Sequence, residues 1–333
     1  MTSESAFEYP QTGFVLPAMG EFNVGQLVEF GVAAAAAGFE SVWAEETWNY
    51  DPFGTLGQVS TRTEVPLGTC IANAYARSPG SLAMSVATLQ EATGGRSILG
   101  LGASTPAVVE GFHGKAHGRP LRRLRELVEI LDLALAGKQI DYEGEIFDLS
   151  GFRLTSGCGP PPVFNAALGE RNIALTVEHM EGLIPHLFPI PAIRDRVDRV
   201  REDVGTDRTP HVAPSVPTSI APDADRARSI LADHVATYVG SVEFYNTVVA
   251  ANGFSEEAQA IAAAWEEGDR DGAADCVSAE LLDAVGITGT PERAQERLAT
   301  LLDDHVDSVL VSFPKKATGE MVEQTIEALG PQS

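Results

Sequence analysis

Two adjacent carboxylates, Glu45 and Glu46, follow a short apolar run and precede the aromatic residues Trp48 and Tyr50. Neighbouring carboxyl groups differ in pKa when one is buried against apolar surface and the other is solvated. A carboxyl group that keeps its proton near neutral pH can act as a general acid. The pair is therefore a candidate proton donor, and the alternative is two solvated loop glutamates.

A second stretch, residues 65–79, combines an apolar run with a polar turn. Residues 65–71 are apolar and partly β-branched, which is typical of an interior strand of a parallel sheet. Ser78 before Pro79 indicates a helix start, because serine caps helices and proline suits the first helical position. The stretch predicts strand, loop and helix, and on composition alone Cys70 within it is a small buried hydrophobe.

These residues need a scaffold that places strand ends side by side. The sequence predicts eight strands, most of them followed by a helix, at residues 12–17, 39–44, 65–71, 95–102, 162–167, 182–187, 211–216 and 307–313. This order favours a (β/α)8 TIM barrel, in which the site lies at the carboxyl ends of the strands. A doubly wound sheet is the competitor, but residues 17–21 lack the glycine-rich turn that it requires.

Two segments interrupt the barrel pattern of a single domain over residues 1–333. The first insertion, about 103–160, follows strand four and contains a predicted hairpin at 142–147. The second, about 223–288, follows strand seven and is predicted to be helical, acidic and without a strand. Gly100 and Gly102 in strand four suggest that another group approaches the backbone closely there.

The composition is strongly acidic, with 47 acidic and 23 basic residues, four of them lysines, and a net charge of −24. Such a surface repels nucleic acid and anionic membranes, and it repels itself unless salt screens it. We expect a salt-loving host, a haloarchaeon, and the alternative is an acidic mesophilic protein. The three cysteines match no metal or disulfide pattern, and no run is long and apolar enough to span a membrane. We expect a cytoplasmic protein without a metal site.

Short motifs occur in a fixed order along most of the chain, at residues 38–43 with 51–53, 67–71, 77–79 with Ala83, 99–102, 112–114 with 120–121, and 289–292. In this order and spacing they resemble the luciferase-like monooxygenase superfamily, in its coenzyme F420-dependent branch, near enzymes of the methylenetetrahydromethanopterin reductase type. The resemblance implies a barrel with insertions and a non-proline cis peptide between Cys70 and Ile71. That bulge would back the deazaflavin ring on the face opposite the substrate.

The resemblance also implies a set of cofactor contacts. Position by position these are Glu45, Cys70, Ile71, Asn73, Ala103, Ser104, Val108, Leu168, Gly169 and Asn172. Backbone N–H groups of the turn at 167–169 would contact a phosphate at a helix N-terminus, although the turn is also compatible with an ordinary connection.

The predicted catalytic residues are Glu46 and Thr105. Glu46 takes the position of the family's proton-handling histidine, and Thr105 that of an acidic residue in the sugar-phosphate enzymes. We assign Glu45 to the cofactor and Glu46 to the substrate side as general acid. Thr105 alternatively caps a turn.

The resemblance implies an oxidoreductase that passes hydride between the deazaflavin and a small organic substrate at a CH–NH or CH–OH group. Without the histidine, the favoured substrate has an electrophilic carbon, such as a methylene-tetrahydropterin or methylene-tetrahydrofolate. One alternative is an FMN-dependent monooxygenase, and another is a cofactor-binding protein without catalysis. We expect a homo-oligomer, either a dimer or a tetramer.

Overall fold

The computed structural model describes residues 7–17, 19–156 and 159–331. Cys158, one of the three cysteines, and Ala18, in the turn after the first predicted strand, lie outside the described residues. Among the described residues, no helix is long and apolar enough to cross a membrane.

The centre of the protein is a parallel sheet in which neighbouring strands are hydrogen-bonded in the order β10-β9-β8-β5-β3-β2-β1-β13-β11-β12. Its strands are β1 Thr12–Val15, β2 Ser41–Ala44, β3 Leu67–Thr69, β5 Ser97–Gly102, β8 Val163–Asn165, β9 Gly182–Leu183, β10 His211–Val212, β11 Ser215–Ile220, β12 Ile287–Gly289 and β13 Val309–Ser312. A two-residue strand, β4 Ala72–Asn73, adds to β5.

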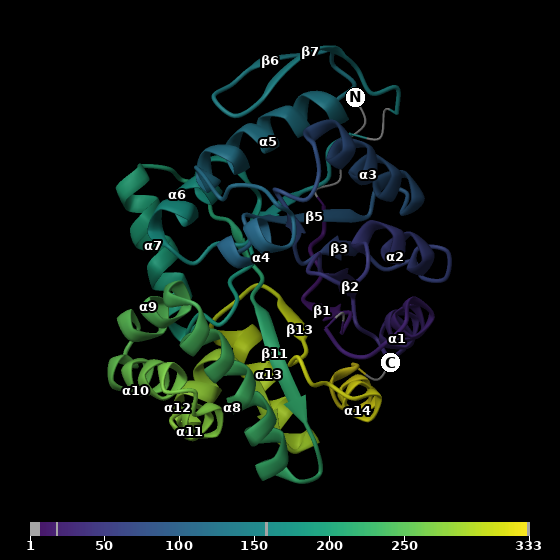
Figure 1. Ribbon diagram of the computed structural model, residues 1–333. Helices are drawn as coiled ribbons and strands as arrows, with labels where there is room; N and C mark the ends of the chain where they lie inside the picture. Colours follow the sequence, from purple (N-terminus) through teal and green to yellow (C-terminus); the bar gives the residue numbers. More distant parts are fainter. Residues whose placement is uncertain (1–6, 18, 157–158, 332–333) are drawn as a thin grey trace.

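The sheet is curled, and one segment, residues 211–220, contributes strands to two parts of it. The first part of this segment, β10, pairs with β9, and the second part, β11, pairs with β13. Hydrogen bonds also join this segment to both neighbours, from Ala213 N to Leu183 O and from Leu310 N to Pro214 O, each at 2.9 Å. The result is a barrel-like α/β fold (Figure 1).

Large side chains fill the inside of the curled sheet, and glycines on neighbouring strands make room for them. A Cβ atom on Gly68 would lie 2.3 Å from the Trp43 ring, and one on Gly182 would lie 2.4 Å from the Phe164 ring. The Trp43 indole N–H donates to Ser41 Oγ at 2.8 Å, which satisfies its polar group inside the barrel. These glycines are therefore needed for close packing.

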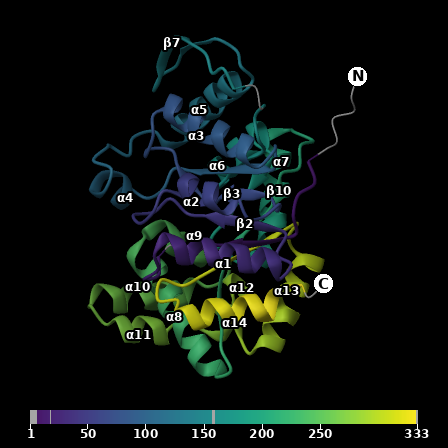
Figure 2. The ribbon, with the colours of Figure 1, turned by 90° about the vertical axis from the view of Figure 1, so that its right-hand side faces the viewer.

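Helices cover the outside of the sheet. They are α1 Val24–Ala36, α2 Pro52–Val59, α3 Pro79–Ala92, α5 Pro120–Leu135, α6 Glu170–His179, α7 Ile193–Val204, α13 Pro291–Asp304 and α14 Gly319–Leu329, with a 3₁₀ turn at Ile190–Ala192. Figure 2 shows α1 and α14, from opposite ends of the chain, side by side. The predicted cap of α3 is confirmed, because Ser78 Oγ accepts a hydrogen bond from Ser81 N at 3.2 Å.

Two excursions leave this framework, and Figure 1 shows the hairpin of the first, β6 and β7, at the end of the molecule opposite the helices of the second. The first contains α4 Pro106–Gly111 and an antiparallel hairpin, β6 Ile140–Glu143 with β7 Asp148–Phe152. The second consists of α8 Ala224–Ser241, α9 Glu243–Ala251, α10 Ser255–Glu266, α11 Arg270–Asp275 and α12 Ala279–Val285. The second excursion has a hydrophobic cluster of its own, which shares no buried member with the main core.

The structure corrects three details of the predicted elements. Strand seven continues to Ile220. A further strand lies at Ile287–Gly289, at the end of the segment that the sequence predicted to be helical and without a strand. Pro217 concealed the first, because proline inside a run argues against a strand, although here Pro217 pairs with Ser312. Helix α4 lies within the first predicted insertion, and its six residues were too few to show a helical period in the sequence.

Candidate active site

The polar turns after β2 and β3 lie against each other at the carboxyl edge of the sheet. Cys70 N donates to Ala44 O at 2.8 Å, and Glu46 N donates to Ile71 O at 3.1 Å. The peptide bond between Cys70 and Ile71 is cis, as the resemblance implied. The two clusters that the sequence places apart are therefore one site.

Strand β5 gives this turn the space that it occupies. A Cβ atom on Gly100 would lie 1.9 Å from Thr69 O, and one on Gly102 would lie 2.9 Å from the side chain of Ile71. Thr69 Oγ1 donates to Gly100 O at 2.7 Å, which ties the two strands together. The predicted close approach at these glycines is confirmed, and the approaching group is the turn after β3.

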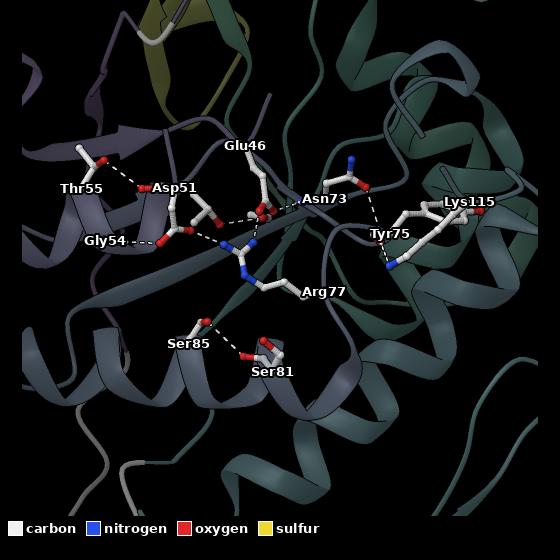
Figure 3. Close-up of polar contacts among 12 residues, drawn as sticks. Glu46, Asp51, Gly54, Thr55, Asn73, Tyr75, Arg77, Ser81, Ser85 and Lys115 are labelled. Atoms are coloured by element: carbon white, nitrogen blue, oxygen red, sulfur yellow. Dashed lines mark hydrogen bonds and ion pairs between the residues drawn. The ribbon is translucent and has the colours of Figure 1, made fainter. Parts of the chain in front are cut away.

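Glu46 is held on two sides by neighbouring residues (Figure 3). One carboxylate oxygen pairs with the Arg77 guanidinium, and the other accepts a hydrogen bond from Asn73 N at 2.8 Å. The same guanidinium pairs with Asp51, whose carboxylate caps α2 by accepting from Gly54 N at 2.9 Å. The side chains of Glu46 and Arg77 are only 11% and 16% exposed. Glu46 thus joins the turn after β2 to the turn after β3.

Asn73 has a buried amide with an unused donor. Its Oδ1 accepts from Tyr75 N at 2.9 Å, whereas its Nδ2 has no hydrogen-bond partner in the described part of the chain. Only 1% of the residue is exposed. An unpaired buried donor is costly, so its presence beside the Cys70–Ile71 turn points to a partner that arrives with a ligand.

Glu45 has surroundings unlike those of Glu46. Burial raises the pKa of its carboxyl group to about 7, although part of its surface stays accessible. Burial and the charge of Glu45 raise the pKa of the Cys70 thiol and of the Tyr245 hydroxyl, which places Glu45 close to both. Glu45 is therefore half protonated near neutral pH.

The wall facing Glu45 is made of aromatic and imidazole rings. His186 lies with its ring centroid 5.4 Å from that of Tyr238, which in turn lies 5.3 Å from Tyr245. Burial lowers the pKa of His186 to about 4, so the ring is neutral. Its Nδ1 lies 3.2 Å from Ser215 O and donates there, which leaves Nε2 as an acceptor.

The sequence profile described as luciferase-like monooxygenase matches residues 7–308. The chain belongs to this family. It is 30% identical over 312 residues to a 5,10-methylenetetrahydromethanopterin reductase of Archaeoglobus fulgidus, covering 90% of this chain and 92% of that protein.

Solved structures show the same fold. The coenzyme F420-dependent tetrahydromethanopterin reductase of Methanopyrus kandleri superimposes with a TM-score of 0.79 and 24% identity, covering 98% of both chains. An F420-dependent secondary alcohol dehydrogenase, in complex with an F420–acetone adduct, superimposes with a TM-score of 0.75 and 15% identity, covering 97% and 98%. This chain is thus a member of the luciferase-like family with oxidoreductases among its relatives.

Four residues of the set that the family resemblance implied lie after β5. Ser104 has a φ of 58°, which turns the chain away from Ala103 at the end of the strand. Thr105 stands at the N-cap of α4 without a side-chain capping bond, and its carbonyl accepts from Val108 N at 3.1 Å. Thr105 therefore turns the chain through its backbone, and its hydroxyl is not used in capping.

The other members of that set lie at the start of α6. Gly169 is the N-cap, and Leu168 before it is buried. The side chain of Asn172 is engaged within the turn, because it donates to Ala166 O at 3.1 Å and accepts from Asn165 Nδ2 at 2.9 Å. Asn172 thus fixes the turn, and the backbone N–H groups remain the part suited to a phosphate.

Sequence reasoning did not assign His186, Tyr238, Tyr245 and Lys315 to the site. Lys315 follows strand eight directly, and the rule that barrel sites lie after the strands could have identified it. Its Nζ lies 5.1 Å from the Tyr238 ring centroid and 6.0 Å from that of Trp48, which is 50% exposed. The two tyrosines lie on inserted helices, to which that rule does not apply.

Proposed function

We propose that this protein is a coenzyme F420-dependent oxidoreductase that transfers hydride between the deazaflavin and a small organic substrate. A methylene-tetrahydropterin or methylene-tetrahydrofolate is the substrate class that we favour. The relative from Archaeoglobus fulgidus and the structural relative from Methanopyrus kandleri, whose names specify tetrahydromethanopterin reductases, support this class. We also infer that the curled sheet is a complete eight-stranded barrel, with residues 211–220 as its seventh strand.

The observation that carries the proposal is the unpaired Asn73 amide beside the Cys70–Ile71 turn. A planar cofactor ring over this turn would offer that amide a carbonyl or ring acceptor. Ile71 would support one face of the ring, and Ala103 with Ser104 would border it. The residues present therefore fit the deazaflavin, which supplies or accepts the hydride when bound.

Glu45 is the residue that we assign to proton handling. A carboxyl group with a pKa of about 7 holds a proton for part of the time at neutral pH and can release it to a substrate nitrogen. Protonation of a nitrogen in a cyclic methylene bridge opens the C–N bond and leaves an iminium carbon, which accepts hydride. The ionised Glu45 carboxylate then stabilises that cation.

Glu46 has a different task in this mechanism. Its carboxylate is already shared between Arg77 and Asn73 N, so it positions the turn that carries Glu45 and the amide of Asn73. This reverses the roles that we expected from the sequence, where Glu46 was the acid. Tyr238 and Tyr245 exclude water from the space between Glu45 and His186.

Titration of the purified protein with coenzyme F420 and FMN, in molar salt and side by side, tests the proposal. We expect saturable binding of F420 that is tighter than that of FMN. Asn73→Asp keeps the acceptor for Tyr75 N but replaces the unpaired donor, and it should weaken F420 binding about tenfold. Asn23→Asp adds the same charge at an exposed helix cap and serves as the control. Tighter binding of FMN would favour the monooxygenase alternative.

A further inference from the structure

A cavity of about 270 Å³ lies between the second excursion and the loop after β13. Residues of α8, α10 and α11 form one side of it, and residues 314–316 form the other. It is separate from the turn at Cys70–Ile71, and none of the predicted site residues lines it. Its lining differs from the rest of the protein surface in charge.

Basic residues gather at this cavity although the chain has a net charge of −24. Two of the four lysines, Lys315 and Lys316, line it together with Arg270. Of the two acidic residues in the lining, Asp233 pairs with Lys316 at 3.0 Å and Asp271 is exposed. The cavity is therefore a local centre of positive charge.

Two of these cations form no ion pair with a described residue, although the charge of Asp233 acts on Lys315 and partly offsets the effect of burial on its pKa. The Arg270 guanidinium lies 3.5 Å from the Trp265 ring centroid and donates to Trp265 O at 2.6 Å. Lys315 forms no ion pair with any described residue, and its Nζ lies over the Tyr238 ring. Burial lowers the pKa of Lys315, so an anion beside it would stabilise its charge.

His234, which also lines the cavity, is a buried side chain without polar partners. It is 5% exposed, and within the described residues neither of its ring nitrogens has a hydrogen-bond partner. Burial, His186 and Lys315 lower its pKa well below the usual value, so the ring is neutral and carries one N–H donor. An unpaired buried donor next to unpaired cations is the arrangement expected of an anion site.

We propose that this cavity binds the anionic end, a carboxylate or phosphate group, of a ligand whose other end lies in the active site. Lys315 supplies the charge, His234 an N–H donor, and Arg270 a guanidinium at the rim. The Lys315 ammonium also lies over the ring of Tyr238, which adjoins His186, so the cavity borders the aromatic wall of the active site. The part of this proposal that concerns the active site rests on the proposed function, whereas anion binding in the cavity does not.

The anion site is tested directly by calorimetric titration with glutarate and with inorganic phosphate at constant ionic strength. We expect saturable binding of at least one of them to the wild-type protein. Lys315→Gln should weaken it about tenfold, and Lys315→Arg, which keeps the charge, should retain it. Lys138→Gln removes the same charge from an exposed lysine elsewhere and should have no effect.

Two further measurements identify which ligand supplies the anion. If it belongs to the cofactor, Lys315→Gln will weaken F420 binding in a fluorescence titration. If it belongs to the substrate, F420 binding will be unchanged and KM for the substrate will rise while kcat is retained. Failure of F420 to bind would overturn the proposed function but leave the anion titration valid.

The proposal is wrong if neither probe binds the wild-type protein, or if Lys315→Gln binds both as tightly as the wild type. Thermal unfolding of each variant shows whether the fold is retained. Should Lys315→Gln fail to fold, Arg270→Gln on the opposite wall provides the same comparison, because it removes a charge from the rim of the cavity. Equal binding by a folded Arg270→Gln variant and the wild type would then count against the site.

Discussion

The two walls of the candidate site differ in how far their polar groups are paired. On the side of β2 and β3, Glu46, Arg77 and Asp51 pair with one another and join two turns, although the Asn73 amide beside them has an unpaired donor. On the side of α8 and β13, neither ring nitrogen of His234 has a hydrogen-bond partner among the described residues, and the Lys315 ammonium lies over the Tyr238 ring. Two adjacent residues show this difference. Burial raises the pKa of the Glu45 carboxyl group, whereas the Glu46 carboxylate accepts a hydrogen bond from Asn73 N.

This difference shows which polar groups serve the protein and which are available to a ligand. A paired carboxylate holds its neighbours in position, so its removal lowers the stability of the fold. A buried group without a partner lowers stability until a ligand arrives, so it persists where binding requires it. Substitutions on the two walls should therefore affect different measurements.

The largest expected effect is on turnover, in the variant Glu45→Gln. This change keeps the shape of the side chain and removes the titrating proton, so we expect kcat to fall by ~10²-fold or more, the range for general acid catalysis. Glu21→Gln, at an exposed glutamate, is the control. Steady-state kinetics on methylene-tetrahydropterin and methylene-tetrahydrofolate measure the effect. A wild-type rate in Glu45→Gln would show that hydride transfer proceeds without this acid.

The next effect is on stability, in the variant Arg77→Met. It leaves the carboxylate of Glu46 buried without its cation, and we expect a loss of about 2–3 kcal/mol in the free energy of unfolding. Arg62→Met breaks the exposed pair of Arg62 with Glu29 and should change little. Denaturant titrations measure both variants. An equal loss of unfolding free energy in both variants would mean that the pair of Glu46 with Arg77 contributes no more to stability than the exposed pair.

The raised pKa of Glu45 predicts a dependence of stability on pH. Folding favours the protonated carboxyl group, so this contribution is complete below pH 4.5 and is lost as the pH rises to about 7. Glu45→Gln, which cannot ionise, should therefore be more stable than the wild type at pH 8 by about 1–3 kcal/mol, and similar to it at pH 4.5. Denaturant titrations at the two pH values test this, and a constant difference would contradict it.

Salt should have the smallest effect on the difference between the two walls. Because the net charge is −24, we expect the melting temperature of the wild type to rise from about 0.1 M to molar salt, as the Debye length falls from ~10 Å to ~3 Å. The difference between wild type and Arg77→Met should persist, since screening hardly reaches a buried pair. A melting temperature that is flat in salt would argue against the salt-loving host.

Much of the framework could be predicted from the sequence because its signals are local. Apolar runs, Ser78 before Pro79, and the glycines of strand four gave the strands, a helix start and the close approach at the third strand. The family resemblance gave the cis bond between Cys70 and Ile71. Local patterns did not reveal the strand residues around Pro217, because proline inside a run argues against a strand.

The division of roles at the site could not be predicted, because it depends on contacts between distant residues. Sequence places Glu45 and Glu46 together, but the pairing that separates them comes from Arg77, 31 residues beyond Glu46. The cavity likewise joins His234 to Lys315, which only the fold brings together. Lys315 could have been found from its position after the last strand, whereas no sequence signal marks His234.

The helices α8–α12 have a hydrophobic core of their own, and this has a consequence for how the protein can change over evolutionary time. His234 of this segment lines the cavity described above, while most members of the segment's hydrophobic cluster belong to α8–α12. Mutations there can alter what is recognised without repacking the strands beneath Asn73. Under the proposed function, sequence change in this segment would alter substrate recognition while the scaffold and its redox chemistry are retained.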